Sequence, residues 1–419
     1  MLISLIVSLF FCGCSEKNEK LVFAVGGAPS EVDYWETLVR EFQNNTGIKV
    51  DLIRQPTDSD QRRQNLVIPL KAGESDPDVF LMDVAWVGQF LASGWLASLN
   101  GFMKNDAFET DPFFQPVIQQ VDTSTNGNLI ALPVYLDCGL LYYRKDLLEK
   151  YGLSVPQTWS QLVESSLAVQ KEMRKDNPDF YGYVWQGAQY EGLICNFLEF
   201  ISSAGGGLEK NGALSIHTPE NINGLEFMHD LIHEHEISPP NTFTEMKEEE
   251  VRSYFQTGNA LYERNWPYAW SLHQQDDSPV KGKTGVAVLP RFKDGRRAAT
   301  LGGWHIGISN FSDQKQNAWR LLKFVVSYET QKKVALRLGW NPGRKDIYDD
   351  EEIRSQMPHI KVLKKALEHS VARPTLPYYT RISSILQKRV NSVLAGDMNA
   401  ETALRKAGEE IGKLADRYE

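Results

Sequence analysis

Aromatic side chains that the sequence places outside regular elements are the first candidates for binding chemistry. Pro267 interrupts any helix in its segment, so Trp266 and Tyr268 are expected on irregular backbone, where binding residues concentrate. Trp304 follows a glycine pair that ends at Gly303 and precedes an expected strand, and glycine lets a ligand approach the backbone closely. Pyranose rings offer apolar C–H faces to flat aromatic rings, so these residues favour sugar binding. Packing of the same rings against their own domain is the alternative.

Two aspartates follow apolar runs that we expect to form strands. Asp83 and Asp137 each come just after such a run, at the position where open α/β sheets place ligand contacts. Tyr135 precedes Asp137 by two residues and therefore shares its face of an extended segment. These carboxylates can accept hydrogen bonds from sugar hydroxyls, although turn capping is the commonest use of Asp. Paired carboxylates also serve as acid and base in glycoside hydrolases, so that enzyme class is the main alternative.

Three more charged residues are candidates for ligand contacts. Glu31 lies at the expected N-terminus of a helix, where the dipole stabilises a carboxylate whether or not it binds a ligand. Arg62 and Arg63 are adjacent, and the sequence leaves open which of them faces a ligand. Exposure of both charges to solvent is the alternative.

Metal, cofactor and nucleic-acid binding are not indicated. His229 and His233 are one helical turn apart, but the order His-Glu-x-x-His is absent, so no metal site is predicted. No cofactor motif and no catalytic triad stand out. The net charge of −9 and the pI near 5.5 disfavour nucleic acid, which needs clustered Lys and Arg. These properties fit a neutral ligand better.

The elements that must position these residues alternate between strand and helix. Residues 21–25 are apolar and predict a strand, and the next segment has apolar residues at helical spacing from Trp35 to Phe42. Ser30 is the expected N-cap of this helix, and Gly47 is expected to end it before a strand at 48–52. This pattern predicts a βαβ unit.

The same alternation continues along the chain and predicts the α/β fold class. Thr158 and Gln161 form an expected capping box before a helix that runs toward residue 173. Further strands are expected at 79–82, 140–143, 284–289 and 304–308, and further helices at 86–90, 146–150, 318–326 and the last twenty residues.

The length of 419 residues exceeds the size at which one hydrophobic core stops growing, so two domains are expected. Cys138 and Cys195 are the only cysteines after the N-terminal segment. Two cysteines are too few for a disulfide scaffold, and they either remain as buried thiols or form one bridge.

The N-terminal residues are typical of a secretory signal. Residues 2–11 are apolar but too few to cross a bilayer as a helix. Residues 11–15 resemble a bacterial lipobox, which makes Cys14 the expected lipid-bearing residue, and the polar residues 16–20 are typical of a tether. A buried N-terminal strand is the alternative. The chain is therefore expected to be an extracytoplasmic lipoprotein, periplasmic or at the cell surface.

Several ordered motifs resemble the extracellular solute-binding proteins of ABC sugar importers, and among them the trehalose/maltose binders. The motifs are Gly-Ile-Lys-Val at 47–50, Pro-Asp-Val-Phe-Leu-Met-Asp at 77–83, Leu-Pro-Val-Tyr at 132–135, Tyr-Tyr-Arg-Lys-Asp-Leu-Leu at 142–148 and Leu-Gly-Gly-Trp-His-Ile-Gly-Ile-Ser at 301–309. The resemblance implies a two-lobed periplasmic-binding-protein fold with a ligand cleft between the lobes. It implies an N-terminal lobe of residues 20–133 with 280–328 and a C-terminal lobe of residues 134–279 with 329–419. Crossing segments are expected near 132–137, 270–280 and 328–337.

The resemblance also implies a function and adds one site residue. Arg373, followed by Pro374, resembles the late arginine that reaches the cleft in the trehalose/maltose binders. The implied protein is a monomer without enzymatic activity that captures a sugar, such as a disaccharide or small oligosaccharide of the maltose/trehalose type. It delivers this sugar to the permease subunits of an importer. A binder of peptides or metals on the same fold is a third possibility.

Overall fold

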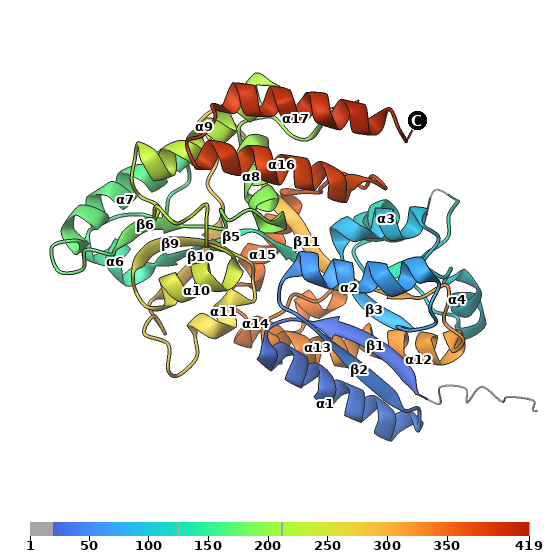
Figure 1. Ribbon diagram of the computed structural model, residues 1–419. Helices are drawn as coiled ribbons and strands as arrows, with labels where there is room; N and C mark the ends of the chain where they lie inside the picture. Colours follow the sequence, from blue (N-terminus) through green and yellow to red (C-terminus); the bar gives the residue numbers. More distant parts are fainter. Residues whose placement is uncertain (1–19, 125, 211–212, 419) are drawn as a thin grey trace, which may run out of the picture.

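The computed structural model of the protein describes residues 20–124, 126–210 and 213–418, so the expected signal segment and Cys14 lie outside the described residues. Two α/β lobes lie side by side, and long strands cross between them (Figure 1). The expected fold class is therefore confirmed.

The first lobe is built on a sheet in the order β12-β11-β3-β1-β2, with β4 also paired to β11. β1 runs parallel to β2 and β3, whereas β11 is antiparallel to β3 and β4. The strands are β1 (Leu21–Gly26), β2 (Val50–Gln55), β3 (Val79–Asp83), β4 (Ala131–Cys138), β11 (Ala299–Ile308) and β12 (Ser370–Val371). The helices of this part of the chain are α1 (Pro29–Thr46), α2 (Ser59–Ala72), α3 (Val87–Ala92), α4 (Asn100–Asp106), α5 (Gln115–Val117), α12 (Lys315–Val325) and α13 (Tyr328–Leu338), with short turns η1 (Val84–Trp86) and η2 (Ile118–Asp122).

The second lobe is built on a sheet in the order β10-β5-β9-β6. Its strands are β5 (Leu140–Arg144), β6 (Tyr181–Val184), β9 (Ala260–Asn265) and β10 (Thr284–Val288), and β7 (Glu209–Lys210) and β8 (Ala213–Leu214) form a separate hairpin. The remaining helices are α6 (Lys145–Lys150), α7 (Trp159–Met173), α8 (Glu191–Ser203), α9 (Pro219–His233), α10 (Glu248–Gln256), α11 (Ala269–His273), η3 (Lys345–Asp349), α14 (Glu351–Gln356), α15 (Ile360–Glu368), α16 (Tyr379–Leu394) and α17 (Ala400–Ala415).

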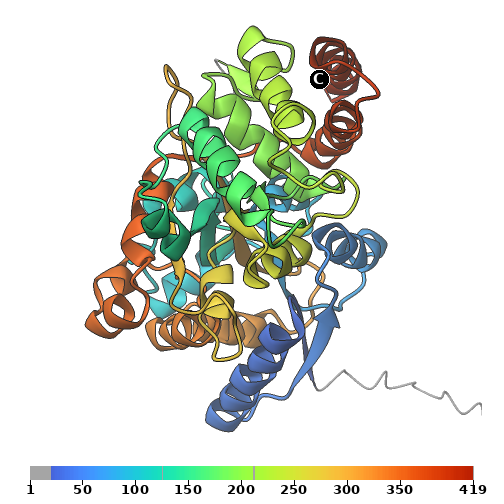
Figure 2. The ribbon, with the colours of Figure 1, turned by 90° about the vertical axis from the view of Figure 1, so that its left-hand side faces the viewer.

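Helix α8 is buried along its whole length because other helices cover it. The C-terminal helices α16 and α17 pack against α8 and α9, beside the helices of the second lobe (Figure 2). The N-terminus of α8 is thereby fixed close to the first lobe, where Glu191 meets Arg373 and Tyr379.

Local sequence signals explain several element ends. Gly47 ends α1 in the left-handed conformation, with φ of 74°, as expected. Thr158 and Gln161 form the expected capping box of α7. The expected cap at Ser30 is wrong, because α1 begins at Pro29 after the N-cap Ala28. The carboxylate of Glu31 accepts a hydrogen bond from the Ala28 N–H at 2.7 Å, so this acid takes over the role of a capping side chain.

The strand pairing corrects the expected lobe boundary at residue 280. β10 pairs antiparallel with β5 in the second sheet, although the expected boundary assigned it to the first lobe. β4 stays in the first sheet up to Cys138, so the chain crosses to the second lobe after that residue. We place the second crossing between β10 and β11. Val334 and Ala335 of α13 pack in the cores of different lobes, as a crossing segment would.

Candidate functional site

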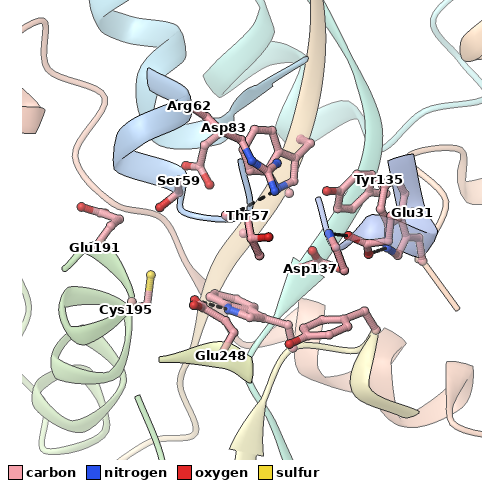
Figure 3. Close-up of a pocket in the computed structure, with 18 of the residues that line it drawn as sticks. Glu31, Thr57, Ser59, Arg62, Asp83, Tyr135, Asp137, Glu191, Cys195 and Glu248 are labelled. Carbon is pink, nitrogen blue, oxygen red and sulfur yellow. Dashed lines mark hydrogen bonds between the residues drawn. The ribbon is translucent and has the colours of Figure 1, made fainter. Parts of the chain in front are cut away.

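A cavity of about 140 Å³ lies between the two lobes (Figure 3). Residues of the first sheet line it, together with Trp266 and Tyr268 after β9 and the first turns of α2, α8 and α10. All of the predicted ligand-binding residues except Arg63 line this cavity: Glu31, Arg62, Asp83, Tyr135, Asp137, Trp266, Tyr268, Gly303, Trp304 and Arg373. The structure thus brings together residues that are up to 342 positions apart in the sequence.

Arg62, and not Arg63, faces this cavity. Arg62 is only 7% exposed and donates hydrogen bonds to the carbonyl oxygens of Pro56 (2.6 Å) and Thr57 (3.3 Å). Its guanidinium lies 4.4 Å from the centroid of the Trp304 ring. Successive residues of a helix point about 100° apart, so Arg63 points elsewhere and lines a neighbouring cavity.

Trp304 lies in β11 and is half-buried between the cavity and the first lobe. Its ring meets that of Trp86 edge to face at a centroid distance of 5.2 Å.

The expectation that Gly303 precedes the strand is wrong, because β11 already begins at Ala299. Gly303 has φ of 135°, and a Cβ there would lie 2.6 Å from the carbonyl oxygen of Tyr135. Glycine is therefore needed here for strand packing.

Trp266 and Tyr268 lie between β9 and α11, on irregular backbone as predicted. The Trp266 indole N–H donates to Glu248 at 3.4 Å, and the Tyr268 hydroxyl donates to Glu249 at 2.7 Å. The guanidinium of Arg264 lies 4.1 Å from the centroid of the Trp266 ring. These contacts hold both aromatic rings in place at the cavity wall.

Asp137 lies on β4 and accepts a hydrogen bond from the side chain of Asn341 at 3.1 Å. Burial raises the pKa of Asp137 to about 7, although the Asn341 bond acts in the opposite direction. Tyr135, on the same strand, packs against Trp340 with ring centroids 4.0 Å apart and the ring planes tilted by 31°. Trp340 donates to Glu31 at 2.7 Å, and burial raises the pKa of Glu31 despite this bond.

Arg373 connects two carboxylates from different lobes. Its guanidinium donates to Asp83 of β3 at 3.0 Å and to Glu191 of α8 at 2.9 Å, and Arg373 is only 5% exposed. Asp83 also accepts from the N–H of Ala85 at 2.8 Å, so it caps a turn as well as lining the cavity. Asp83 therefore caps a turn and lines the cavity, and its contact with a ligand stays a prediction.

An ion pair also joins the lobes at a position outside the cavity lining. Asp58, the N-cap of α2, accepts from the Gln61 N–H at 3.0 Å. The ammonium group of Lys247, the N-cap of α10, donates to the same carboxylate at 2.8 Å. This pair therefore links an element of the first lobe to an element of the second.

Sequence reasoning missed several residues that line the cavity. Trp340 precedes an Asn-Pro pair on irregular backbone, which is the same signal that identified Trp266. The acidic run that includes Glu248 and Glu249 stands at the start of a helix, where such residues are commonly only dipole partners. The other missed lining residues are Ala28, Thr57, Ser59, Glu191, Gly192 and Cys195. Cys195 and Cys138 are both buried free thiols.

The cavity combines flat rings with an excess of hydrogen-bond acceptors. Its carboxylates are Glu31, Asp83, Asp137, Glu191, Glu248 and Glu249, and its cationic side chains are Arg62 and Arg373. This balance disfavours anionic ligands and suits the hydroxyl groups of a neutral ligand, which can donate to the carboxylates. Within the described ranges, no group of three or more His, Cys, Asp or Glu residues is arranged to hold a metal ion.

Asp137→Asn is expected to stabilise the sugar-free protein at about pH 8 and to have little effect near pH 4. The carboxyl pKa is raised from 3.8 to about 7 by burial, so the native protein keeps a proton that the unfolded chain loses. The contribution of this group to the free energy of unfolding therefore falls as pH rises from about 4 to 7. Because asparagine does not ionise, the variant does not lose stability in this way as pH rises. Melting temperatures across this range measure the effect.

The matched control for this experiment is Asp397→Asn, because Asp397 is exposed on a surface turn. We expect no pH-dependent difference between this variant and the wild type. If the gain from Asp137→Asn is the same at low and high pH, Asp137 does not carry a raised pKa.

Two α/β lobes that enclose a polar and aromatic cavity define a two-lobed solute-binding protein. Comparisons with known proteins agree, since a family profile described as bacterial extracellular solute-binding protein matches residues 28–332. The chain is 34% identical over 403 residues to a probable ABC transporter-binding protein of Deinococcus radiodurans, covering 95% of this chain and 94% of that one. It is 25% identical to the maltotriose-binding protein of Pyrococcus abyssi, covering 92% and 80%.

Solved structures show the same similarity. The maltose-bound MalE3 of T. maritima is 39% identical, with a TM-score of 0.88 over 94% of this chain and 99% of that one. A solute-binding protein of Thermotoga lettingae bound to α-D-tagatose is 27% identical, with a TM-score of 0.84 over 94% and 99%. The chain therefore belongs to the family of bacterial extracellular solute-binding proteins, the extracytoplasmic binding components of ABC transporters. In the described part of the chain, no helix has the length and apolar character that crossing a membrane requires.

Proposed function

We propose that this protein binds a disaccharide or small oligosaccharide of the maltose/trehalose type and delivers it to the permease subunits of an ABC importer. The observation that carries the proposal is the interlobe cavity, where Trp266, Tyr268 and Trp304 lie among carboxylates that can accept from hydroxyls. Because both lobes line the cavity, a bound sugar bridges them and favours a closed arrangement.

The relatives support a sugar and leave the choice of sugar to experiment. Maltose, maltotriose and α-D-tagatose appear in the names of three similar proteins. Binding without catalysis fits the family of solute-binding proteins to which the chain belongs. The protein acts as a monomer in this proposal and needs no cofactor.

Calorimetric titration with maltose, trehalose and maltotriose tests the proposal, together with small-angle scattering. We expect saturable binding of at least one sugar and a smaller radius of gyration at saturation. Failure of all these sugars to bind would contradict the proposed function. Release of reducing ends from an oligosaccharide during the titration would instead indicate a glycoside hydrolase.

We also propose that Cys14 carries a lipid anchor. Cells that express the wild type should incorporate labelled palmitate into this protein, whereas Cys14→Ser should remain unlabelled and appear as soluble or unprocessed protein. Cys12→Ser is the control, because it changes a neighbouring thiol and should still be labelled. Equal labelling of wild type and Cys14→Ser would rule out this anchor.

A further inference from the structure

A buried ion pair lies behind one aromatic wall of the interlobe cavity, the proposed sugar cavity. Arg264 of β9 is fully buried, and Glu199 of α8 is only 2% exposed. The guanidinium donates through Nε to one carboxylate oxygen of Glu199 at 2.9 Å and through Nη2 to the other at 2.5 Å. Neither residue lines the cavity, so the function proposed above does not use this pair.

The stability of the fold alone does not require such a pair. Moving two charges out of water has a large desolvation cost, and apolar side chains of similar size often stabilise a protein as well as a buried ion pair does. The backbone also leaves room for the pair at Gly139, because a Cβ there would lie 2.1 Å from Oε1 of Glu199 and 2.7 Å from Nη2 of Arg264. The position of the pair beside the cavity offers an explanation for its presence.

The ring of Trp266 rests on this pair. The Arg264 guanidinium lies 4.1 Å from the ring centroid, within the range of cation–π attraction. The edge of the ring approaches Gly302, where a Cβ would lie 2.9 Å from the ring atom Cζ3. Trp266 also lines the cavity. Because the guanidinium covers one face of the ring, the face that a sugar can contact is the opposite one.

The same carboxylate holds the strand that carries Trp304. Oε1 of Glu199 accepts a hydrogen bond from the N–H of Thr300 in β11 at 3.0 Å. The Thr300 hydroxyl donates to the carbonyl oxygen of Cys195, one turn earlier in α8, at 2.7 Å. Glu199 is thus bonded both to the support of the Trp266 ring and to the strand of Trp304.

We propose that Arg264 and Glu199 are positioning residues for sugar binding, which hold the Trp266 ring with its free face toward the cavity before a ligand arrives. This inference rests on the proposed sugar-binding function. A side chain that is already fixed loses little rotational freedom on binding, so the pair increases affinity without touching the sugar. Its effect on affinity must then depend on the presence of the Trp266 ring.

A charge-free double variant, Arg264→Met with Glu199→Gln, tests this inference. Met fills the space of the guanidinium, and Gln keeps an acceptor for the N–H of Thr300. The variant should bind the tightest-bound of maltose, trehalose and maltotriose about three- to thirtyfold more weakly than the wild type, as expected from loss of a cation–π contact. In a Trp266→Ala background, the same double variant should add no more than about a twofold loss. Calorimetric titration of the four proteins measures these differences.

Arg144→Met with Asp146→Asn is the matched control, since this bidentate pair also belongs to the second lobe but does not line the cavity. Its affinity should stay within about twofold of the wild type. Gly139→Ala is an independent variant in case the charge-free variant folds poorly, because its methyl group displaces the pair and should weaken binding in the same Trp266-dependent way. Gly412→Ala is its control, since a Cβ there lies in open space.

Wild-type affinity in both the charge-free variant and Gly139→Ala would overturn this inference and leave the proposed function intact. An equal loss of affinity with and without the Trp266 ring would also overturn it, because the pair would then act on the fold as a whole. Unchanged affinity in Trp266→Ala itself would have the same consequence, since the ring would not contact the sugar. If the wild type binds none of the three sugars, the proposed function and this inference fail together.

Discussion

Trp304→Ala is expected to weaken sugar binding about ten- to hundredfold. The substitution removes an aromatic surface that contributes about 1 to 3 kcal/mol to binding, through stacking and apolar burial. Trp304 is half-buried and touches Trp86 and Arg62, so the sugar-free protein should lose less stability than from truncation of a fully buried Trp. Calorimetric titration and melting curves of the sugar-free protein measure the two effects separately.

Trp319→Ala is the matched control for this substitution. Trp319 is fully buried under the first sheet and lines neither cavity, so its truncation should cost about 3 to 5 kcal/mol of stability. The folded fraction of that variant should bind sugar normally. If Trp304→Ala behaves in the same way, Trp304 is a core residue and the binding site lies elsewhere.

Arg373→Met is expected to lower the free energy of unfolding by about 3 to 5 kcal/mol, because it leaves the carboxylates of Asp83 and Glu191 without their cation. Sugar binding should weaken as well, since the side chain lines the cavity. Urea unfolding at about pH 7 measures the loss of stability, and calorimetric titration measures the loss of affinity.

Two further variants control the experiment on Arg373. Arg405→Met breaks an exposed pair with Glu409 one turn away on α17, and such pairs contribute only about 0.3 to 0.5 kcal/mol. Arg373→Lys keeps the charge but lacks the planar guanidinium fork that bonds both carboxylates, so its stability should be intermediate. A loss from Arg373→Met no larger than that from Arg405→Met would show that the buried network does not stabilise the fold.

The sequence predicted those site residues whose position depends on their neighbours in the chain. Pro267 placed Trp266 and Tyr268 on irregular backbone, and Gly47 marked the end of α1. By contrast, the choice between Arg62 and Arg63 depends on how α2 is rotated against the first sheet, and no local pattern encodes that rotation. Glu31 illustrates both cases, since its position at a helix start was predicted but its bond to Trp340 was not.

Nonlocal pairing explains the error in the lobe boundary. The apolar residues of 284–289 predict a strand, but the same pattern fits either sheet. β10 joins the second sheet because it pairs with β5, which lies about 140 residues earlier in the chain. The motif Leu-Gly-Gly-Trp at 301–304 lies in β11, which pairs with β4 in the first sheet. The chain therefore changes lobe between β10 and β11, and the sequences of these two strands are both apolar.

Because the ion pair between Asp58 and Lys247 joins the lobes outside the cavity, a change in this pair can alter the affinity for ligands without altering the selectivity among them. Neither residue lines the sugar cavity, so a change at Lys247 alters only how often the empty protein adopts the binding-competent arrangement. Such a change multiplies the dissociation constants of all ligands by one common factor. A partly exposed pair of this kind contributes about 1 kcal/mol, so that factor is about fivefold. Evolution or engineering could thus match the protein to scarce or abundant nutrients while its order of preference among sugars stays the same.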